Sequence, residues 1–191
     1  SIFTRHLESR YERFNLLRHV LFFSSNVVWG FTILLTLSSL GPGTSIESVR
    51  HCNDTLRRLL DPHYAIINVS SHTLRTEPWA PHTALLVFPS GADLPFCREL
   101  DGEGNRRIDH YIRQLGGRYL GFCAGAYYGA KTVEFEMGSK KMEVRGHREL
   151  GFFKGVARGS VYPGFVYGSD TCAVAANIIS SLPENAIQNE Q

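Results

Sequence analysis

Two short runs of apolar residues are typical of strands that are buried on both faces of a sheet. Residues 84–88 (ALLVF) form an unbroken run, and residues 65–69 (AIINV) form a second strand-like segment. Strands of a parallel sheet are apolar at successive positions because helices cover both faces of the sheet. The first run ends in Pro89-Ser90-Gly91-Ala92-Asp93, and α/β sheets bind ligands at the carboxyl ends of central strands. The pattern therefore predicts an α/β domain with a candidate binding loop at Ser90–Asp93.

Helical periodicity predicts two helices that flank these strands. A Gly-Pro-Gly turn at residues 41–43 leads to Thr44 and Ser45, which are good helix caps, and apolar positions then recur to residue 60. A second apolar stripe, at spacings of three and four, runs from Ile108 to Leu115 and ends at two glycines. Strands alternating with helices are typical of a mostly parallel sheet with helices on both sides, a three-layer arrangement.

The segments beyond residue 130 have a different pattern. Residues 132–137 and 141–145 alternate around Gly138 and Ser139, which predicts a β-hairpin. Residues 151–169 are rich in glycine and aromatic residues, so short strands and turns are expected. Residues 171–191 begin apolar and end polar, as expected of a C-terminal tail.

The N-terminal region allows two interpretations. Residues 1–19 are polar and rich in arginine, and residues 20–40 carry no charge. Length and charge fit a membrane span or signal anchor, with the arginines on the cytoplasmic side. The seven Ser, Thr and Asn residues in this run instead favour a buried first strand near residues 31–37, or a packed helix. We therefore divide the chain into an apolar, Arg-rich segment (1–40), a domain (41–170) and a tail (171–191).

The most informative stretch is residues 119–129, where a short strand runs into Gly121-Phe122-Cys123-Ala124-Gly125 and then into a helix. This is the pattern of a nucleophile elbow, in which the apex residue has a strained backbone and needs glycines around it. A cysteine at a helix N-terminus gains thiolate character. The alternative is structural, since free cysteines are commonly small core residues. The flanking glycines favour a catalytic or binding cysteine, with Gly121, Ala124 and Gly125 shaping the pocket.

Charge and cysteine content exclude several classes of function. The net charge is only +2, with no basic stripe, which argues against nucleic acid as a partner. The four cysteines contain no Cys-x-x-Cys pair, so we predict no metal site and no cofactor. Few cysteines in a chain of 191 residues indicate a reducing, cytoplasmic setting. The alternative is a membrane-anchored protein with its N-terminus in the cytoplasm.

Five motifs, in order, carry a family resemblance. They are Gly41-Pro42-Gly43-Thr44, Thr76-Glu77-Pro78-Trp79, Val87-Phe88-Pro89-Ser90-Gly91-Ala92-Asp93, Gly121-Phe122-Cys123-Ala124-Gly125 and the aromatic block from Gly151 to Tyr167. Residues 41–170 resemble the amino-terminal domain of fungal biotin–protein ligases, a branch of the class I glutamine amidotransferase-like fold. The resemblance implies a flavodoxin-like sheet. It also implies a small-molecule ligand or the ligase's catalytic region as the partner.

Three departures from the family pattern matter. Ser90 stands where the family usually has glycine, and a glycine-type backbone angle there would carry strain. Residues 1–36 have no counterpart. The biotin- and ATP-binding region is absent, so we expect that this chain alone does not ligate biotin.

A cysteine of the amidotransferase type also needs a histidine base and an orienting carboxylate. The only histidine after Cys123 is His147, in His147-Arg148-Glu149, where the resemblance places no catalytic residue. A surface turn is the favoured interpretation of this segment. We therefore favour a regulatory or weakly catalytic domain. The alternatives are a thioester-forming amidotransferase or amide hydrolase, with an oxyanion held by the Gly91 and Ala124 amides, and a membrane-anchored interaction protein.

Overall fold

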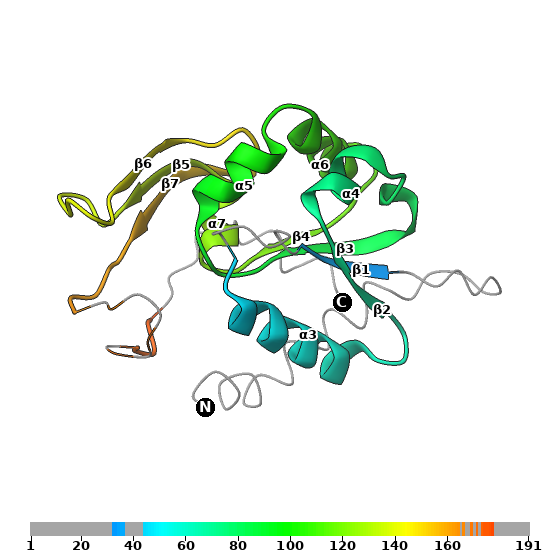
Figure 1. Cartoon of the computed structure of the whole chain (residues 1–191), viewed down its shortest axis with the longest axis horizontal. Helices are drawn as coiled ribbons and strands as arrows, with labels where there is room; N and C mark the ends of the chain where they lie inside the picture. Colours follow the sequence, from blue (N-terminus) through cyan, green and yellow to red (C-terminus); the bar gives the residue numbers. More distant parts are fainter. Residues whose placement is uncertain are drawn as a thin grey trace, which may run out of the picture.

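The computed structural model describes residues 32–36, 44–164, 166, 169, 171 and 173–177. Its centre is a parallel sheet with the strand order β2-β1-β3-β4. The strands are β1 (Thr32–Thr36), β2 (Ala65–Val69), β3 (Thr83–Phe88) and β4 (Tyr119–Gly121). Helix α3 (Ile46–Leu60) covers one face, and α4 (Ser71–Thr76), α5 (Asp93–Leu100) and α6 (Glu103–Arg113) cover the other (Figure 1). The predicted α/β class is confirmed.

Strand β3 carries the core on both of its faces. Leu86 and Phe88 contact α4, α5 and α6 through one apolar cluster, and Val87 contacts α3 through the other. Successive side chains of a strand point to opposite faces, so one continuous apolar run supplies both cores. All three side chains are fully buried.

The helices around this strand begin and end largely where their sequence indicates. Ser45 caps α3 by accepting a hydrogen bond from the Ser48 amide at 3.3 Å, as predicted from the turn before it. Helix α6 corresponds to the predicted apolar stripe and buries Ile108 and Tyr111. Helices α4 and α5, of six and eight residues, were not predicted, because a helix of two turns is too short for periodicity to identify.

A second sheet of three strands has the order β6-β5-β7 (Figure 1). The predicted hairpin is confirmed, since β5 (Ala130–Phe135) pairs antiparallel with β6 (Val144–His147). Strand β7 (Phe153–Gly159) then pairs with β5 in parallel, which the local pattern did not indicate. Helix α7 (Ala124–Tyr128) links the two sheets in the sequence.

The N-terminal apolar run contributes a strand. Strand β1 lies between β2 and β3, which confirms the strand interpretation for residues 32–36. The predicted domain begins at residue 41 and so leaves out β1, although β1 is paired with two strands of that domain. Among the described residues, no helix combines the length and apolar character that a membrane span requires. Residues 20–31 and 37–40 of the predicted span, and residues 178–191 of the predicted tail, lie outside the described residues.

Candidate functional site

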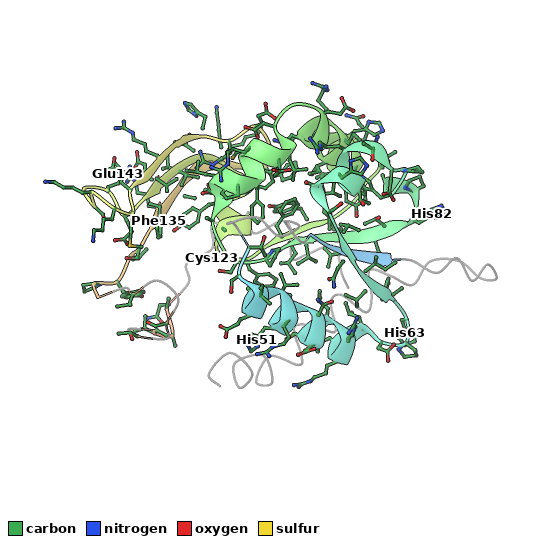
Figure 2. The ribbon with its side chains drawn as sticks, in the orientation of Figure 1. His51, His63, His82, Cys123, Phe135 and Glu143 are labelled. Atoms are coloured by element: carbon green, nitrogen blue, oxygen red, sulfur yellow. The ribbon has the colours of Figure 1, made fainter. Side chains whose placement is uncertain are left out.

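Cys123 occupies a tight turn between β4 and α7 (Figure 2). Its backbone angles are φ 48° and ψ −106°, a region that costs a residue with a side chain about 1–3 kcal/mol. Its side chain is exposed. The strand and helix predicted on either side of this cysteine are both confirmed, and its thiol faces solvent from a strained backbone.

The two flanking glycines are required by close packing. A Cβ atom on Gly125 would lie 2.2 Å from the carbonyl oxygen of Phe88, at the end of β3. A Cβ atom on Gly121 would lie 2.5 Å from the backbone of Gly125. The Phe122 amide donates to that same Phe88 carbonyl at 2.9 Å. Because the opposing atoms are backbone, they cannot move aside, so the Gly-x-Cys-x-Gly spacing holds the turn against β3.

The predicted binding loop follows β3 and is fastened to the start of α3. The Ser90 amide donates to the Ser48 hydroxyl at 2.9 Å, and the Ser90 carbonyl accepts from the Ser45 amide at 3.2 Å. Gly91 forms an isolated antiparallel bridge with Thr44. The loop is thus positioned by α3 at the same end of the sheet as Cys123, and the Ser90 amide is already engaged.

Serine at position 90 does not strain the loop. Among the described residues other than glycine, only Cys123 and Glu136 have a positive φ. The glycine-type angle falls instead on Gly91, with φ 149°. The departure from the family pattern at Ser90 is therefore compatible with the turn.

Asp93 begins α5 and is buried, and its carboxylate binds Arg148. The Arg148 Nε and Nη2 atoms both lie 2.7 Å from Asp93 Oδ2, and the Arg148 and Asp93 side chains are 3% and 8% exposed. Arg148 also donates to the His147 carbonyl at 2.9 Å. Asp93 was predicted as a pocket residue, and its carboxylate is engaged in joining the loop to the second sheet. Sequence reasoning missed Arg148, which lies 55 residues away from Asp93.

His147 and Glu149 have separate partners. His147 Nδ1 lies 3.1 Å from the Thr132 hydroxyl, across the β5–β6 pair. Glu149 accepts hydrogen bonds from the Gly102 amide and the Asn105 side chain, both at 2.8 Å, at the start of α6. Within the described part of the chain, no hydrogen bond joins His147 to Glu149. The arrangement that a base and its orienting carboxylate would need is therefore not formed.

Two earlier histidines lie far from Cys123. His63 and His82 precede β2 and β3, so they are at the amino ends of parallel strands, whereas Cys123 follows the carboxyl end of β4 (Figure 2). Across the residues that the structure describes, no three His, Cys, Asp or Glu side chains gather as metal ligands do.

Tyr127 is a neighbour of Cys123 that the sequence analysis did not select. It lies one helical turn further along α7, and its amide donates to the Cys123 carbonyl at 3.0 Å. Partial burial raises the pKa of the Tyr127 phenol, and the negative charges of Cys123, Asp93 and Glu136 raise it further. The spacing of four residues on a helix is the signal that could have found it. A Cβ atom added to Gly159 would lie 1.9 Å from the Tyr127 hydroxyl, and the Tyr127 ring packs edge-on against Phe135. The phenol therefore packs against β5 and β7 of the second sheet.

The other described cysteines differ from Cys123. Cys52 and Cys97 are half-buried. Burial raises the pKa of the Cys52 thiol, and it raises the pKa of the Cys97 thiol to about 11. Both therefore carry little thiolate at neutral pH. Cys172 lies outside the described residues.

Comparison with known proteins now defines the family. A family model described as "Biotin-protein ligase, N terminal" matches residues 36–191. The chain belongs to this family. The match to the biotin–protein ligase N-terminal domain begins within β1 and extends over the predicted tail.

Two proteins are similar in sequence to most of this chain. The biotin–protein ligase of Schizosaccharomyces pombe is 39% identical over 139 residues, which are 73% of this chain and 22% of the ligase. An uncharacterized protein of Chlamydia muridarum is 40% identical over 139 residues, which are 71% of this chain and 53% of that protein. The chain thus spans about a fifth and about half of these relatives, one fungal and one bacterial.

Proposed function

We propose that this biotin–protein ligase N-terminal domain is a regulatory or weakly catalytic module in which Cys123 binds or reacts with a small ligand. In this proposal the fold is of the flavodoxin-like, class I glutamine amidotransferase-like type, and the Cys123 turn is its nucleophile elbow. The main support is the exposed thiol on a backbone with φ 48°. Strain of this kind persists where surrounding packing enforces it, and it is concentrated at functional sites.

The packing around Cys123 supports this proposal. The glycines at 121 and 125 lie against backbone atoms of the turn and of β3, so the fold stabilises the turn at the cost of strain at one residue. Loop 90–93 follows β3 at the same end of the parallel sheet as the Cys123 turn, and Tyr127 lies one turn along α7. Among the hydrogen bonds of the described residues, none uses the Ala124 amide. Of the two amides proposed for an oxyanion, Gly91 and Ala124, we therefore favour Ala124.

A regulatory role is favoured over rapid hydrolysis because, in the part of the chain that the structure describes, His147 and Glu149 are not arranged as a base and its orienting carboxylate. Cysteine nucleophiles of this kind are activated by an adjacent histidine that a carboxylate orients. Here His147 is directed to Thr132 and Glu149 to α6. We therefore expect a thiol that binds or is acylated without efficient turnover.

The proposed partners are a small molecule at Cys123 and, for the domain as a whole, the catalytic region of a biotin–protein ligase. The second rests on the name of the S. pombe relative, of which this chain covers 22%. We also place the domain in the cytoplasm, because the three described cysteines are unpaired, as is typical of a reducing compartment.

Alkylation kinetics test the proposed thiol. In a Cys172→Ser background at neutral pH, we expect iodoacetamide to modify Cys123 at least about ten-fold faster than Cys97, because Cys123 is exposed and the pKa of Cys97 is raised to about 11. Peptide mass spectrometry would measure each rate, with Cys123→Ser as the control. Equal rates, or an inert Cys123, would contradict a reactive site.

A glutaminase assay separates binding from turnover. We expect ammonia release from glutamine by the full chain to equal that of Cys123→Ser, because His147 and Glu149 are not arranged as a base and its orienting carboxylate. Release that depends on Cys123 would instead establish the amidotransferase alternative.

A further inference from the structure

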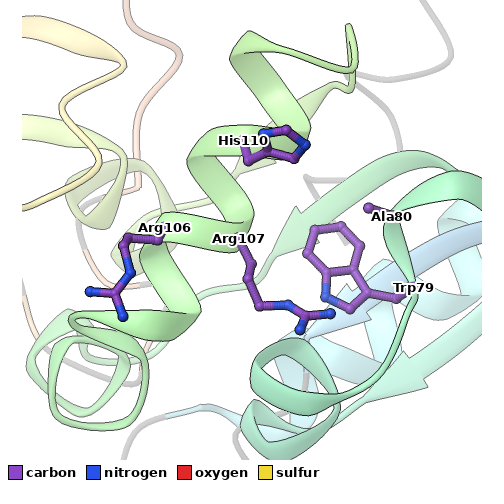
Figure 3. A pocket seen from close by; sticks show the side chains of 5 residues that line it. All are labelled: Trp79, Ala80, Arg106, Arg107 and His110. Carbon is purple, nitrogen blue, oxygen red and sulfur yellow. The ribbon is translucent and has the colours of Figure 1, made fainter.

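A second candidate site lies at the opposite end of the sheet from Cys123. It is a pocket of about 220 Å³ between α6 and the segment before β3 (Figure 3). Its walls are Trp79, Ala80, Arg106, Arg107 and His110. Trp79 and Ala80 precede β3, whereas Cys123 follows β4, which runs parallel to β3. The two sites are therefore separated by the length of the sheet.

One wall of the pocket carries positive charge. Arg107 extends from α6 towards Trp79, and His110 lies one helical turn further along (Figure 3). Arg107 donates to the backbone carbonyl of Glu77, a neutral acceptor, so this contact leaves its charge uncompensated. Within the described residues, no carboxylate forms an ion pair with Arg107.

Arg106 adds a second charge at the margin. It pairs with Glu103 at 2.5 Å, but the two side chains are 70% and 55% exposed. Exposed pairs of this kind contribute little free energy, so Glu103 is a weak competitor for Arg106. The wall formed by α6 therefore keeps a net positive charge.

The facing wall is rigid and apolar. The Trp79 indole is only 7% exposed, and its Nε1 donates to the Leu74 carbonyl at 2.9 Å. Its ring also packs edge-on against Tyr111, with the centroids 5.0 Å apart. With its one polar atom already bonded, the indole presents carbon to the pocket. An apolar wall displaces water from a bound group and so strengthens its attraction to nearby cations.

We propose that this pocket binds the carboxylate or phosphate group of a small anion, held by Arg107 with support from Arg106 and His110. The planar guanidinium group binds both oxyanions through paired hydrogen bonds. Ligand pockets usually measure about 300–1,000 Å³, so a volume of about 220 Å³ suits one oxyanion with a short apolar portion rather than a whole nucleotide. This site is independent of Cys123 and of the function proposed for it.

The fluorescence of Trp79, in the wall of the pocket, can report the binding of an anion. The chain contains two tryptophans, so Trp29→Phe leaves the fluorescence of Trp79 alone. We would titrate this variant with inorganic phosphate, with succinate and with sodium chloride at matched ionic strength. We expect a saturable fluorescence change with phosphate or succinate and none with chloride, and the responding salt identifies the preferred oxyanion.

Two variants then test the assignment of residues. Arg107→Ala should weaken binding at least about ten-fold, the loss expected for a charged hydrogen-bond donor. Arg57→Ala, on α3, is the matched control and should leave binding unchanged. Glu103→Gln should tighten binding by about two-fold, because it removes the carboxylate nearest Arg106.

Arg107→Ala removes a hydrogen bond to the Glu77 carbonyl and so could unfold the segment before β3. In that case Glu103→Gln, which keeps Arg107, still tests the site. Weaker binding in a folded Arg107→Ala variant, or tighter binding in Glu103→Gln, supports the site. No saturable response to either anion, or a response that both variants leave unchanged, overturns it.

Discussion

Strand β3 of the parallel sheet and strand β7 of the three-stranded sheet bury their side chains to very different degrees. On β3, Leu86, Val87 and Phe88 are fully buried, because helices cover both faces of that sheet. On β7, Phe153 and Val156 remain 61% and 43% exposed. The comparison also shows where changes are costly. A Cβ atom added to Gly121 or Gly125 in the Cys123 turn would meet backbone atoms, whereas one added to Gly155 or Gly159 of β7 would meet side chains.

A short segment fastens the two regions together. Arg148 and Leu150 are buried, whereas Glu149 between them is exposed and caps α6. Leu150 belongs to the main apolar cluster, and Arg148 reaches Asp93 at the start of α5. Segment 148–150 is thus anchored in the core of the first region, although it leads from β6 to β7.

The largest expected effect comes from breaking this anchor. Asp93→Ala would leave the Arg148 guanidinium buried without a counter-charge, and we expect a loss of about 3–5 kcal/mol in the free energy of unfolding. Glu134→Ala breaks a matched pair in the second sheet, Arg158–Glu134 at 2.6 Å, where Arg158 is 72% exposed. That change should cost below about 1 kcal/mol. Urea denaturation would measure both.

The double variant Asp93→Ala/Arg148→Met provides the control for this interpretation. Replacing both partners of a buried pair removes the unpaired charge, so much of the lost stability should return. Equal costs for Asp93→Ala and Glu134→Ala would mean that burial does not distinguish the two regions.

A second comparison uses glycines. Gly125→Ala places a methyl group 2.2 Å from a backbone oxygen, and we expect it to cost up to about 3 kcal/mol and to slow alkylation of Cys123. Gly138→Ala, in the β5–β6 turn, meets no atom within 4 Å and is strained only by its φ of 87°. Its expected cost is about 1 kcal/mol. Thermal unfolding and the alkylation assay together would measure both effects, and a Gly125→Ala variant that resembled Gly138→Ala would refute tight packing at the turn.

The smallest expected effect is a loss of folding stability at alkaline pH, caused by buried thiol and phenol groups that pack around the parallel sheet. The pKa of the Cys97 thiol is raised by burial from 9.0 to about 11, so the unfolded chain loses this proton first. The stability that this group contributes is fully present below pH 9 and is lost as the pH rises through about 11. Burial also raises the pKa values of Tyr111, Tyr119 and Tyr128, which act in the same direction.

We therefore expect the thermal unfolding midpoint to fall as the pH rises above 9, and to fall less in Cys97→Ala. Circular dichroism between neutral pH and pH 10 would measure it. A midpoint that rose with pH, or an identical fall in Cys97→Ala, would show that Cys97 is not a source of the alkaline sensitivity.

Much of the framework could be predicted from local pattern. The unbroken run at 84–88 indicated a strand covered on both faces, and Ser45 indicated where α3 begins. The alternation around Gly138 indicated the β5–β6 pair. These features depend on residues a few positions apart, and such spacing is visible in a sequence. Pairing of β7 with β5 was not predictable, because it depends on residues brought together over long separations.

The sequence by itself determined the α/β class, the family and the position of one cysteine between two glycines. Only the tertiary structure decided that Asp93 is paired with Arg148, that the Ser90 amide is bonded to Ser48, and that His147 and Glu149 point to different partners. It also brought Trp79 and Arg107 together in a second pocket. The physical reason is that capping and periodicity act within one or two turns of chain, whereas ion pairs and pockets depend on which distant segments the core packs against one another.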